Sequence, residues 1–203
     1  MRFGPLARFV LRVAAWLPVT FAVWYLAAPV LVWPAASLAE LVARDGFGDL
    51  VRSVERSGAV VSFVTSLKPA YGAVTGPVSA VVSVDSNVLL YSFGLPMLVA
   101  LILAAGEPHV VRHMLVGYLV LVPFQTWGVV ADFLKTVAIT AGPAVSAQAG
   151  FSPWQREVIA FSYQFGTLIL PTVAPAVVWV LMHRRFLENL RGAARAASGD
   201  PRA

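Results

Sequence analysis

Residues 87–106 read NVLLYSFGLPMLVALILAAG, and this stretch decides the class of fold. It carries no charge, and as a helix it would rise about 30 Å, the thickness of the hydrocarbon core of a bilayer. Its polar residues gather at the front, at Asn87, Tyr91 and Ser92, and Pro96 lies near the middle. The stretch predicts a bent transmembrane helix whose front marks the membrane interface, with no reaction attached to it.

The composition of the whole chain agrees with a membrane protein. Of its 203 residues, 59% are hydrophobic and only 12% are charged, whereas soluble domains carry about 25% charged residues. The absence of cysteine excludes disulfides, thiolate metal ligands and a cysteine nucleophile. The net charge of +5 comes mostly from arginines beside apolar segments, so we expect membrane lipids, and no nucleic acid, as partners.

Four charge-free segments are long enough to span a bilayer: Val13–Ala39, Ser86–Gly106, Met114–Ala131 and Val158–Met182. The first is too long for the apolar part of a cleaved signal peptide, which is about 7–15 residues. A fifth segment, Thr136–Gln155, is rich in Gly, Pro and small polar residues that would leave backbone groups unsatisfied in lipid. We expect it to continue the third helix and then form a loop.

The predicted fold class is an α-helical integral membrane protein with four transmembrane helices and a small extracytoplasmic α+β segment between spans one and two. Nine Lys and Arg residues flank the spans on the side of the termini, against six on the other side. The positive-inside rule therefore places both termini in the cytoplasm. The predicted segments are a cytoplasmic N-terminus (1–12), span one (13–33), the extracytoplasmic segment (34–86), span two (87–106), a cytoplasmic loop (107–113), span three (114–135), an extracytoplasmic loop (136–157), span four (158–182) and a cytoplasmic tail (183–203).

The extracytoplasmic segment is predicted to contain amphipathic helices followed by a β-hairpin. Apolar residues recur at helical spacing over 38–42 and over 50–54, and the DGFG sequence at 45–48 predicts a break between two short helices. Residues 61–67 and 78–85 instead alternate with period two and contain many β-branched residues, which favours two strands with turns between them. Because two strands alone are marginally stable in water, we expect them to pack on the helix or on a partner.

The sequence predicts no catalytic centre, metal site or cofactor. Glu107, His109 and His113 lie close together, and the two histidines are four positions apart, but a zinc site needs a third strong ligand. No G-x-S-x-G nucleophile motif occurs, and all the histidines are expected at the cytoplasmic edge. We interpret the 107–113 segment as an interfacial loop whose charges mark the end of the membrane.

Several polar residues in or beside the spans are candidates for helix packing or interaction. Asp132 and Lys135 can pair at i, i+3 spacing near the outer interface, where we expect a structural ion pair. The amides of Gln125 and Gln164 fall in apolar spans and are expected to hydrogen-bond across helices, each for about 1 kcal/mol. Gly94, Gly128 and Gly166 would allow helices to approach closely. The candidate interaction residues are Asn87, Tyr91, Gln125, Asp132, Lys135 and Gln164.

Four stretches carry a resemblance to a known family. The chain resembles the exosortase H-associated membrane proteins of Gram-negative bacteria at RFVLRVAAWLPVTFAVWY (8–25), at NVLLYSFGLP (87–96), at LVPFQTWG (121–128), and at 164–190 with its LILPTVAP and HRRFLENL. The resemblance implies a partner, an exosortase, which is a membrane enzyme that processes proteins bearing a C-terminal sorting signal. Exosortases resemble cysteine transpeptidases, and this chain has no cysteine, so the resemblance implies an accessory protein.

Three functions remain open at the level of sequence. The first is a non-enzymatic accessory protein that binds the sorting enzyme or its substrate through the extracytoplasmic segment. The second is a small transport or export component in which Gln125, Tyr163, Gln164 and Asp132 line a path. The third, a membrane hydrolase, requires a histidine on the same side of the membrane as a nucleophile.

Overall fold

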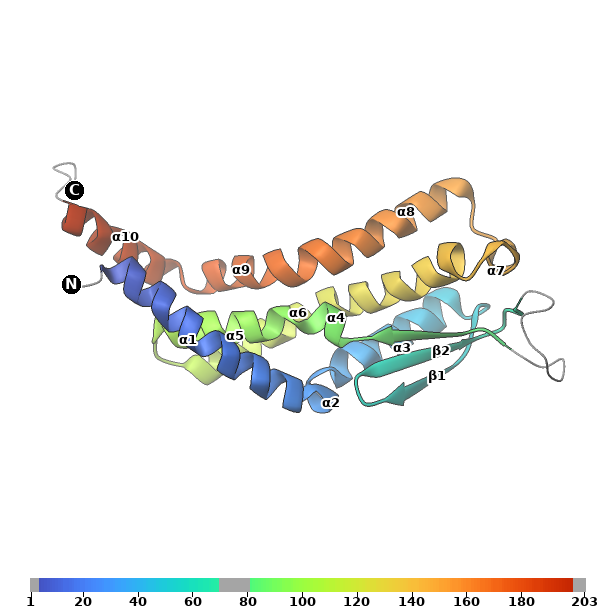
Figure 1. Cartoon of the computed structure of the whole chain (residues 1–203), viewed down its shortest axis with the longest axis horizontal. Helices are drawn as coiled ribbons and strands as arrows, with labels where there is room; N and C mark the ends of the chain where they lie inside the picture. Colours follow the sequence, from blue (N-terminus) through green and yellow to red (C-terminus); the bar gives the residue numbers. More distant parts are fainter. Residues whose placement is uncertain (1–3, 70–80, 199–203) are drawn as a thin grey trace. The chain divides into compact units, whose positions relative to one another are not determined.

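The computed structural model describes residues 4–69 and 81–198. The chain is mostly helical (75%) and contains one small antiparallel sheet (Figure 1). It divides into two compact units: unit 1 is formed by residues 1–27, 93–121 and 172–203, and unit 2 by residues 28–92 and 122–171. Each unit is therefore assembled from segments that are far apart in the sequence.

All the regular secondary structure in the described part of unit 1 is helical. Pro5 lies in the first turn of the N-terminal helix α1 (Pro5–Leu26), where a residue without an N–H group leaves no hydrogen bond unmade. The α1 helix packs along α5 (Gly94–Ala105). Phe9 of the first helix stacks on Trp179, with ring centroids 5.4 Å apart. The helices of unit 1 are α1, α5, the first part of α6 (Val110–Lys135), most of α9 (Leu170–Met182) and α10 (Arg184–Ser198).

Unit 2 combines helices with the sheet. The α8 helix starts at a capping box, in which Ser152 and Gln155 satisfy each other's backbone N–H groups. Two π-helical turns, η1 and η2, continue α6 and α8 respectively. The helical elements of unit 2 are α2 (Ala28–Leu31), α3 (Trp33–Phe47), α4 (Leu89–Ser92), the second part of α6, η1 (Thr136–Thr140), α7 (Pro143–Ala149), α8 (Pro153–Gln164) and η2 (Phe165–Ile169).

The sheet has three antiparallel strands in the order β1-β2-β3: β1 (Val51–Ser57), β2 (Val60–Thr65) and β3 (Ser83–Asn87). Gly58 starts the tight turn from β1 to β2 with φ +59°, a conformation that glycine adopts without strain. Alternate residues of β2 are buried, as the period-two pattern predicts. Phe63 of β2 is fully buried and its ring centroid lies 4.7 Å from that of Phe133 on α6, so this pair anchors the sheet to the helix.

The predicted helix over 50–54 is wrong, because β1 occupies this region. Its apolar residues fit a helical spacing, but an irregularity in register between Val51 and Ser53 disrupts the strict alternation that would have indicated a strand. The helix does end within the predicted break at 45–48, since α3 stops at Phe47 and β1 follows it. The predicted two-stranded hairpin is corrected to three strands, with β3 starting at Ser83; residues 78–80 of the predicted second strand lie outside the described residues.

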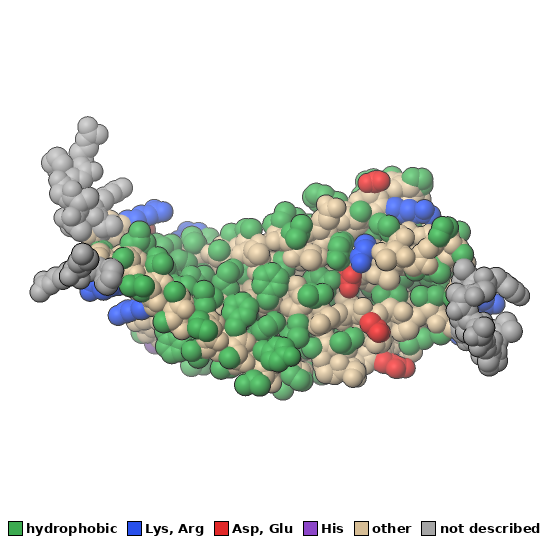
Figure 2. Space-filling model, in the orientation of Figure 1, with side chains coloured by type: hydrophobic (Ala, Val, Ile, Leu, Met, Phe, Trp, Pro, Cys, Tyr) green, Lys and Arg blue, Asp and Glu red, His purple; other side chains and the backbone are tan. Residues whose placement is uncertain are grey.

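Within residues 4–69 and 81–198, three helical segments are long and apolar enough to cross a membrane: Pro5–Leu26, Val110–Thr140 and Pro153–Met182. A further apolar helix, Leu89–Ala105, is shorter. Large apolar side chains are exposed on these segments, among them Leu26 (81%), Val111 (78%) and Phe161 (68%). Figure 2 shows such side chains gathered over α1. Exposed apolar surface of this kind is what a lipid environment requires.

The helix boundaries differ from the predicted segments at two places. The first long helix starts at Pro5 and ends at Leu26, and residues up to Phe47 continue as the separate helices α2 and α3. The predicted loop over 136–157 is largely helical, since it holds η1, α7 and the first turn of α8. The predicted continuation of the third helix is confirmed, because η1 extends α6 to Thr140.

Candidate functional site

A polar cluster centred on Asp132 connects the sheet and helices of unit 2. Ser86, at the end of β3, is fully buried and donates a hydrogen bond of 2.8 Å to Asp132 Oδ2. The Lys135 ammonium lies 3.3 Å from Asp132 Oδ1, so the ion pair that the i, i+3 spacing predicts is present. Lys135 also lies over the ring of Tyr163, 4.4 Å from its centroid. The hydroxyl of buried Tyr91 donates to the same carboxylate.

The remaining predicted residues have separate environments. The Asn87 side chain accepts a hydrogen bond of 3.1 Å from the backbone N–H of Leu89 and so forms a turn immediately before α4. Gln125 is buried, and its Oε1 atom has no hydrogen-bond partner among the described residues. Gln164, which is expected to hydrogen-bond across helices, is exposed on the surface of α8. The structure therefore brings Tyr91, Asp132 and Lys135 together and leaves the other three outside that cluster.

An apolar cavity of about 540 Å³ lies in unit 2 between α3, α6 and α8. Its polar contributions are limited to two hydroxyl residues and the Trp127 indole, whose N–H donates to the Ser162 carbonyl oxygen at 3.2 Å. Such walls suit an acyl chain or apolar side chains and offer nothing for catalysis. The lining residues are Leu38, Val42, Phe47, Pro123, Thr126, Trp127, Val130, Ala131, Leu134, Val158, Ile159 and Ser162.

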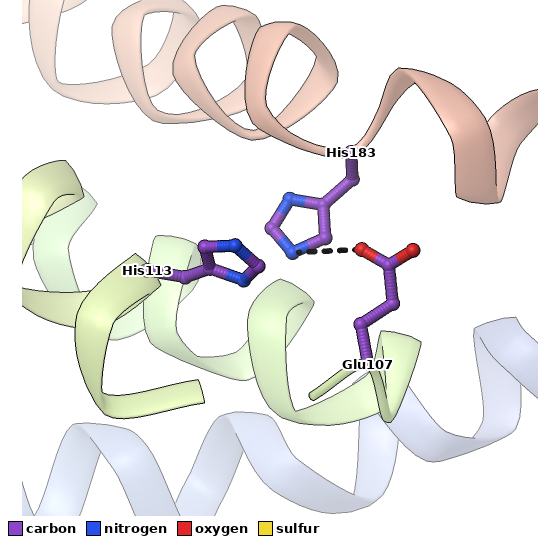
Figure 3. Close-up of side chains that lie close together, drawn as sticks. All are labelled: Glu107, His113 and His183. Atoms are coloured by element: carbon purple, nitrogen blue, oxygen red, sulfur yellow. Dashed lines mark ion pairs between the residues drawn. The ribbon is translucent and has the colours of Figure 1, made fainter. Parts of the chain in front are cut away.

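A second polar cluster lies in unit 1 and joins three segments of its chain. Glu107 comes from the link between α5 and α6, His113 from the first turn of α6, and His183 from the junction of α9 and α10. Figure 3 shows these three side chains pointing toward one another. One ligand atom from each lies within 4.8 Å of the others, and the His183 Nε2 atom is 3.6 Å from Glu107 Oε2. The cluster borders a cavity of about 340 Å³.

The surroundings of His183 determine its chemical state. Its side chain is fully buried, and Trp179 stacks on it at 5.5 Å between ring centroids. Burial lowers the pKa of His183, and the nearby carbonyl of Trp179 and carboxylate of Glu107 oppose this effect. The neutral imidazole is therefore favoured, and a neutral imidazole can use its free nitrogen as a ligand.

The sequence alone does not predict that Glu107, His113 and His183 lie together. Glu107 and His113 stand out as a pair of ligand types, but His183 lies in the HRRF segment, far along the chain, where its neighbours suggest only a topology signal. His109 was the third member suggested by proximity in sequence, yet it is not one of the three clustered ligands. Only the packing of α9 in unit 1 shows that His183 is the third residue of the cluster.

These features define the class of protein: a mostly helical protein whose described residues include three helical segments long and apolar enough to cross a membrane and a small antiparallel sheet. The family model described as "Exosortase H-associated membrane protein" matches residues 4–186, and the chain belongs to this family. The resemblance noted in the sequence is thereby confirmed. Comparison with curated proteins and with solved structures found no match.

Proposed function

We propose that this chain is a non-enzymatic accessory protein of the bacterial inner membrane that binds the sorting enzyme exosortase H or its substrate. The observation that carries the proposal is the family match over residues 4–186, since the family is described by its association with exosortase H. The chain has no cysteine, so it lacks the nucleophile of a cysteine transpeptidase. An accessory role accounts for both the family match and the absence of cysteine, since an accessory protein needs no nucleophile of its own.

The proposed topology has four spans and cytoplasmic termini. The three long apolar helices support three crossings. The fourth is Leu89–Ala105, whose helical length of about 25 Å is slightly less than a hydrocarbon core and is accommodated by local thinning of the bilayer. The excess of arginine beside the termini supports the orientation. In this arrangement the sheet faces the extracytoplasmic side, where sorting signals arrive.

Gln164 is the residue best suited to contact the partner inside the membrane. It is exposed on α8, about 9 Å inside the predicted fourth span. A polar side chain at that depth rarely faces lipid, and its amide can both donate and accept a hydrogen bond to another helix. A helix of the exosortase packed against this face of α8 would supply the missing partner.

The test is recovery of exosortase H with the tagged chain after extraction in mild detergent. We expect wild-type protein to retain the enzyme, and Gln164→Leu to reduce recovery about fivefold, which corresponds to the loss of one interhelical hydrogen bond of about 1 kcal/mol. Gln125→Leu is the matched control, because it makes the same change at a buried amide whose oxygen has no partner in the described part of the chain. We expect this control to leave recovery unchanged.

A deletion strain gives the corresponding test in cells. Loss of an accessory protein should impair the processing of proteins with the C-terminal sorting signal, and wild-type protein should restore it. If the enzyme is not recovered with the wild-type chain and sorting is normal in the deletion strain, the proposed function is wrong.

A further inference from the structure

The cluster of Glu107, His113 and His183 contains two nitrogen atoms that the described structure leaves without a hydrogen-bond partner. Both His113 Nδ1 and His183 Nε2 are buried and unpaired. The 3.6 Å between His183 Nε2 and Glu107 Oε2 is too long for a hydrogen bond. Nearly all buried polar atoms in proteins have a hydrogen-bond partner. Two unpaired nitrogens in one cluster therefore point to a ligand that binds between these side chains.

Hydrogen bonding at the other nitrogen fixes the tautomer of His183. Its Nδ1 atom lies 3.1 Å from the carbonyl oxygen of Trp179. A carbonyl oxygen only accepts, so Nδ1 carries the proton and donates it. In the neutral ring, Nε2 then presents a lone pair toward the Glu107 carboxylate. This arrangement, in which a backbone carbonyl orients an imidazole through its second nitrogen, is the usual support of a metal-binding histidine.

We propose that Glu107, His113 and His183 bind one divalent transition-metal ion, with Zn²⁺ as the first candidate. Two imidazoles and one carboxylate form a ligand set that proteins use for zinc and that leaves a fourth position open. Ligand atoms around tetrahedral zinc are about 3.4 Å apart, so the three side chains must move inward from their present spacing of up to 4.8 Å. The adjoining cavity provides space for this movement and for a water ligand.

The positive side chains beside the cavity restrict what fills the fourth position. Arg184 and Arg185 line the cavity together with the cluster. Their guanidinium groups oppose a bare cation, and they favour an anionic oxygen or hydroxide as the remaining ligand. A bound ion would join the α5–α6 link to the α9–α10 junction within unit 1, and this inference does not depend on the exosortase.

The test is Zn²⁺ titration of the purified full-length chain in detergent, after removal of metal by chelation and with an affinity tag that contains no histidine. We expect one equivalent to bind saturably and to raise the unfolding temperature. With Co²⁺ we expect the visible absorption of a four-coordinate site. We expect His113→Ala, His183→Ala and Glu107→Gln each to weaken binding at least tenfold, the minimum effect seen when even a supporting residue is lost.

His109→Gly is the matched control, because it removes the neighbouring histidine that lines the cavity but is not one of the clustered ligands. Glycine suits this position, where φ is +63°. We expect its affinity for Zn²⁺ to equal that of the wild type. Should the wild-type chain fail to bind Zn²⁺ or Co²⁺, or should binding survive the change at His183 and disappear with His109→Gly, the proposed site is wrong. Because wild-type binding is itself measured, poor folding of a variant does not decide the outcome.

Discussion

Gly128→Val is expected to destabilise the protein by more than about 3 kcal/mol. A Cβ atom at this position would lie 2.3 Å from Cδ1 and 2.9 Å from Cβ of Tyr91. These atoms belong to the root of the side chain, which cannot move without displacing α4, and Tyr91 is itself buried. The measurement is the midpoint of unfolding in detergent, and we expect the variant to unfold at markedly lower temperature or to fail to accumulate.

Two further variants isolate the cause. Gly46→Ala is the control for glycine replacement, since no atom of another described segment lies within 4 Å of the added methyl group, and alanine is more favourable than glycine inside a helix by about 1 kcal/mol. In the Tyr91→Ala background, Gly128→Ala should cost less stability than it does in the wild type, because the contacts with Tyr91 Cδ1 and Cγ are gone and only the 2.9 Å contact with Cβ remains. If Gly128→Val is as stable as the wild type, the close approach of Tyr91 to α6 is wrong.

Asp132→Ala is expected to cost about 3 kcal/mol. The change leaves the largely buried Lys135 ammonium without its carboxylate and removes the acceptor of the Ser86 hydroxyl. The unpaired Lys135 ammonium costs more than the lost acceptor of the Ser86 hydroxyl. The double variant Asp132→Ala with Lys135→Met should therefore recover much of the stability. Asp85→Ala is the control, because this neighbouring carboxylate on β3 is exposed, and surface changes usually lie within about 0.5 kcal/mol of the wild type.

Unfolding midpoints and sorting activity, measured on the same variants, distinguish two roles for the Asp132 cluster. A purely structural ion pair predicts that the double variant is stable and still supports sorting. If the double variant is stable but sorting fails, the charges contribute directly to function. A single variant as stable as the wild type would contradict the structural role of the pair.

The sequence predicted the features that depend on local pattern. Long apolar segments identified the helices, alternation identified β2, and the small residues Gly128 and Gly166 indicated a close approach: a Cβ atom on Gly166 would lie 3.1 Å from Gly128 Cα. The spacing of Asp132 and Lys135 predicted their ion pair correctly. Most of these features are determined by residues a few positions apart. The close approach at Gly128 and Gly166 follows from the small size of glycine, which is the same in any environment.

The features that sequence reasoning missed depend on tertiary packing. The β1 strand has weak strand character of its own and forms because β2 offers a partner. Exposure of Gln164 depends on the rotation of α8, which hydropathy does not encode. His183 joins Glu107 and His113 only because α9 returns to α6 within unit 1. No pattern within a single segment could have indicated these three results.

Single-cysteine labelling tests the proposed topology most directly, because the chain contains no cysteine of its own. Ser57→Cys and Arg112→Cys place a thiol at exposed positions on either side of the Leu89–Ala105 helix, the only candidate span between them in the described residues. With a membrane-impermeant maleimide on intact cells with a permeable outer membrane, we predict that the thiol at 57 reacts and the thiol at 112 reacts only after lysis. Equal reactivity of both thiols in intact cells would mean that Leu89–Ala105 does not cross the membrane, and the four-span account would be wrong.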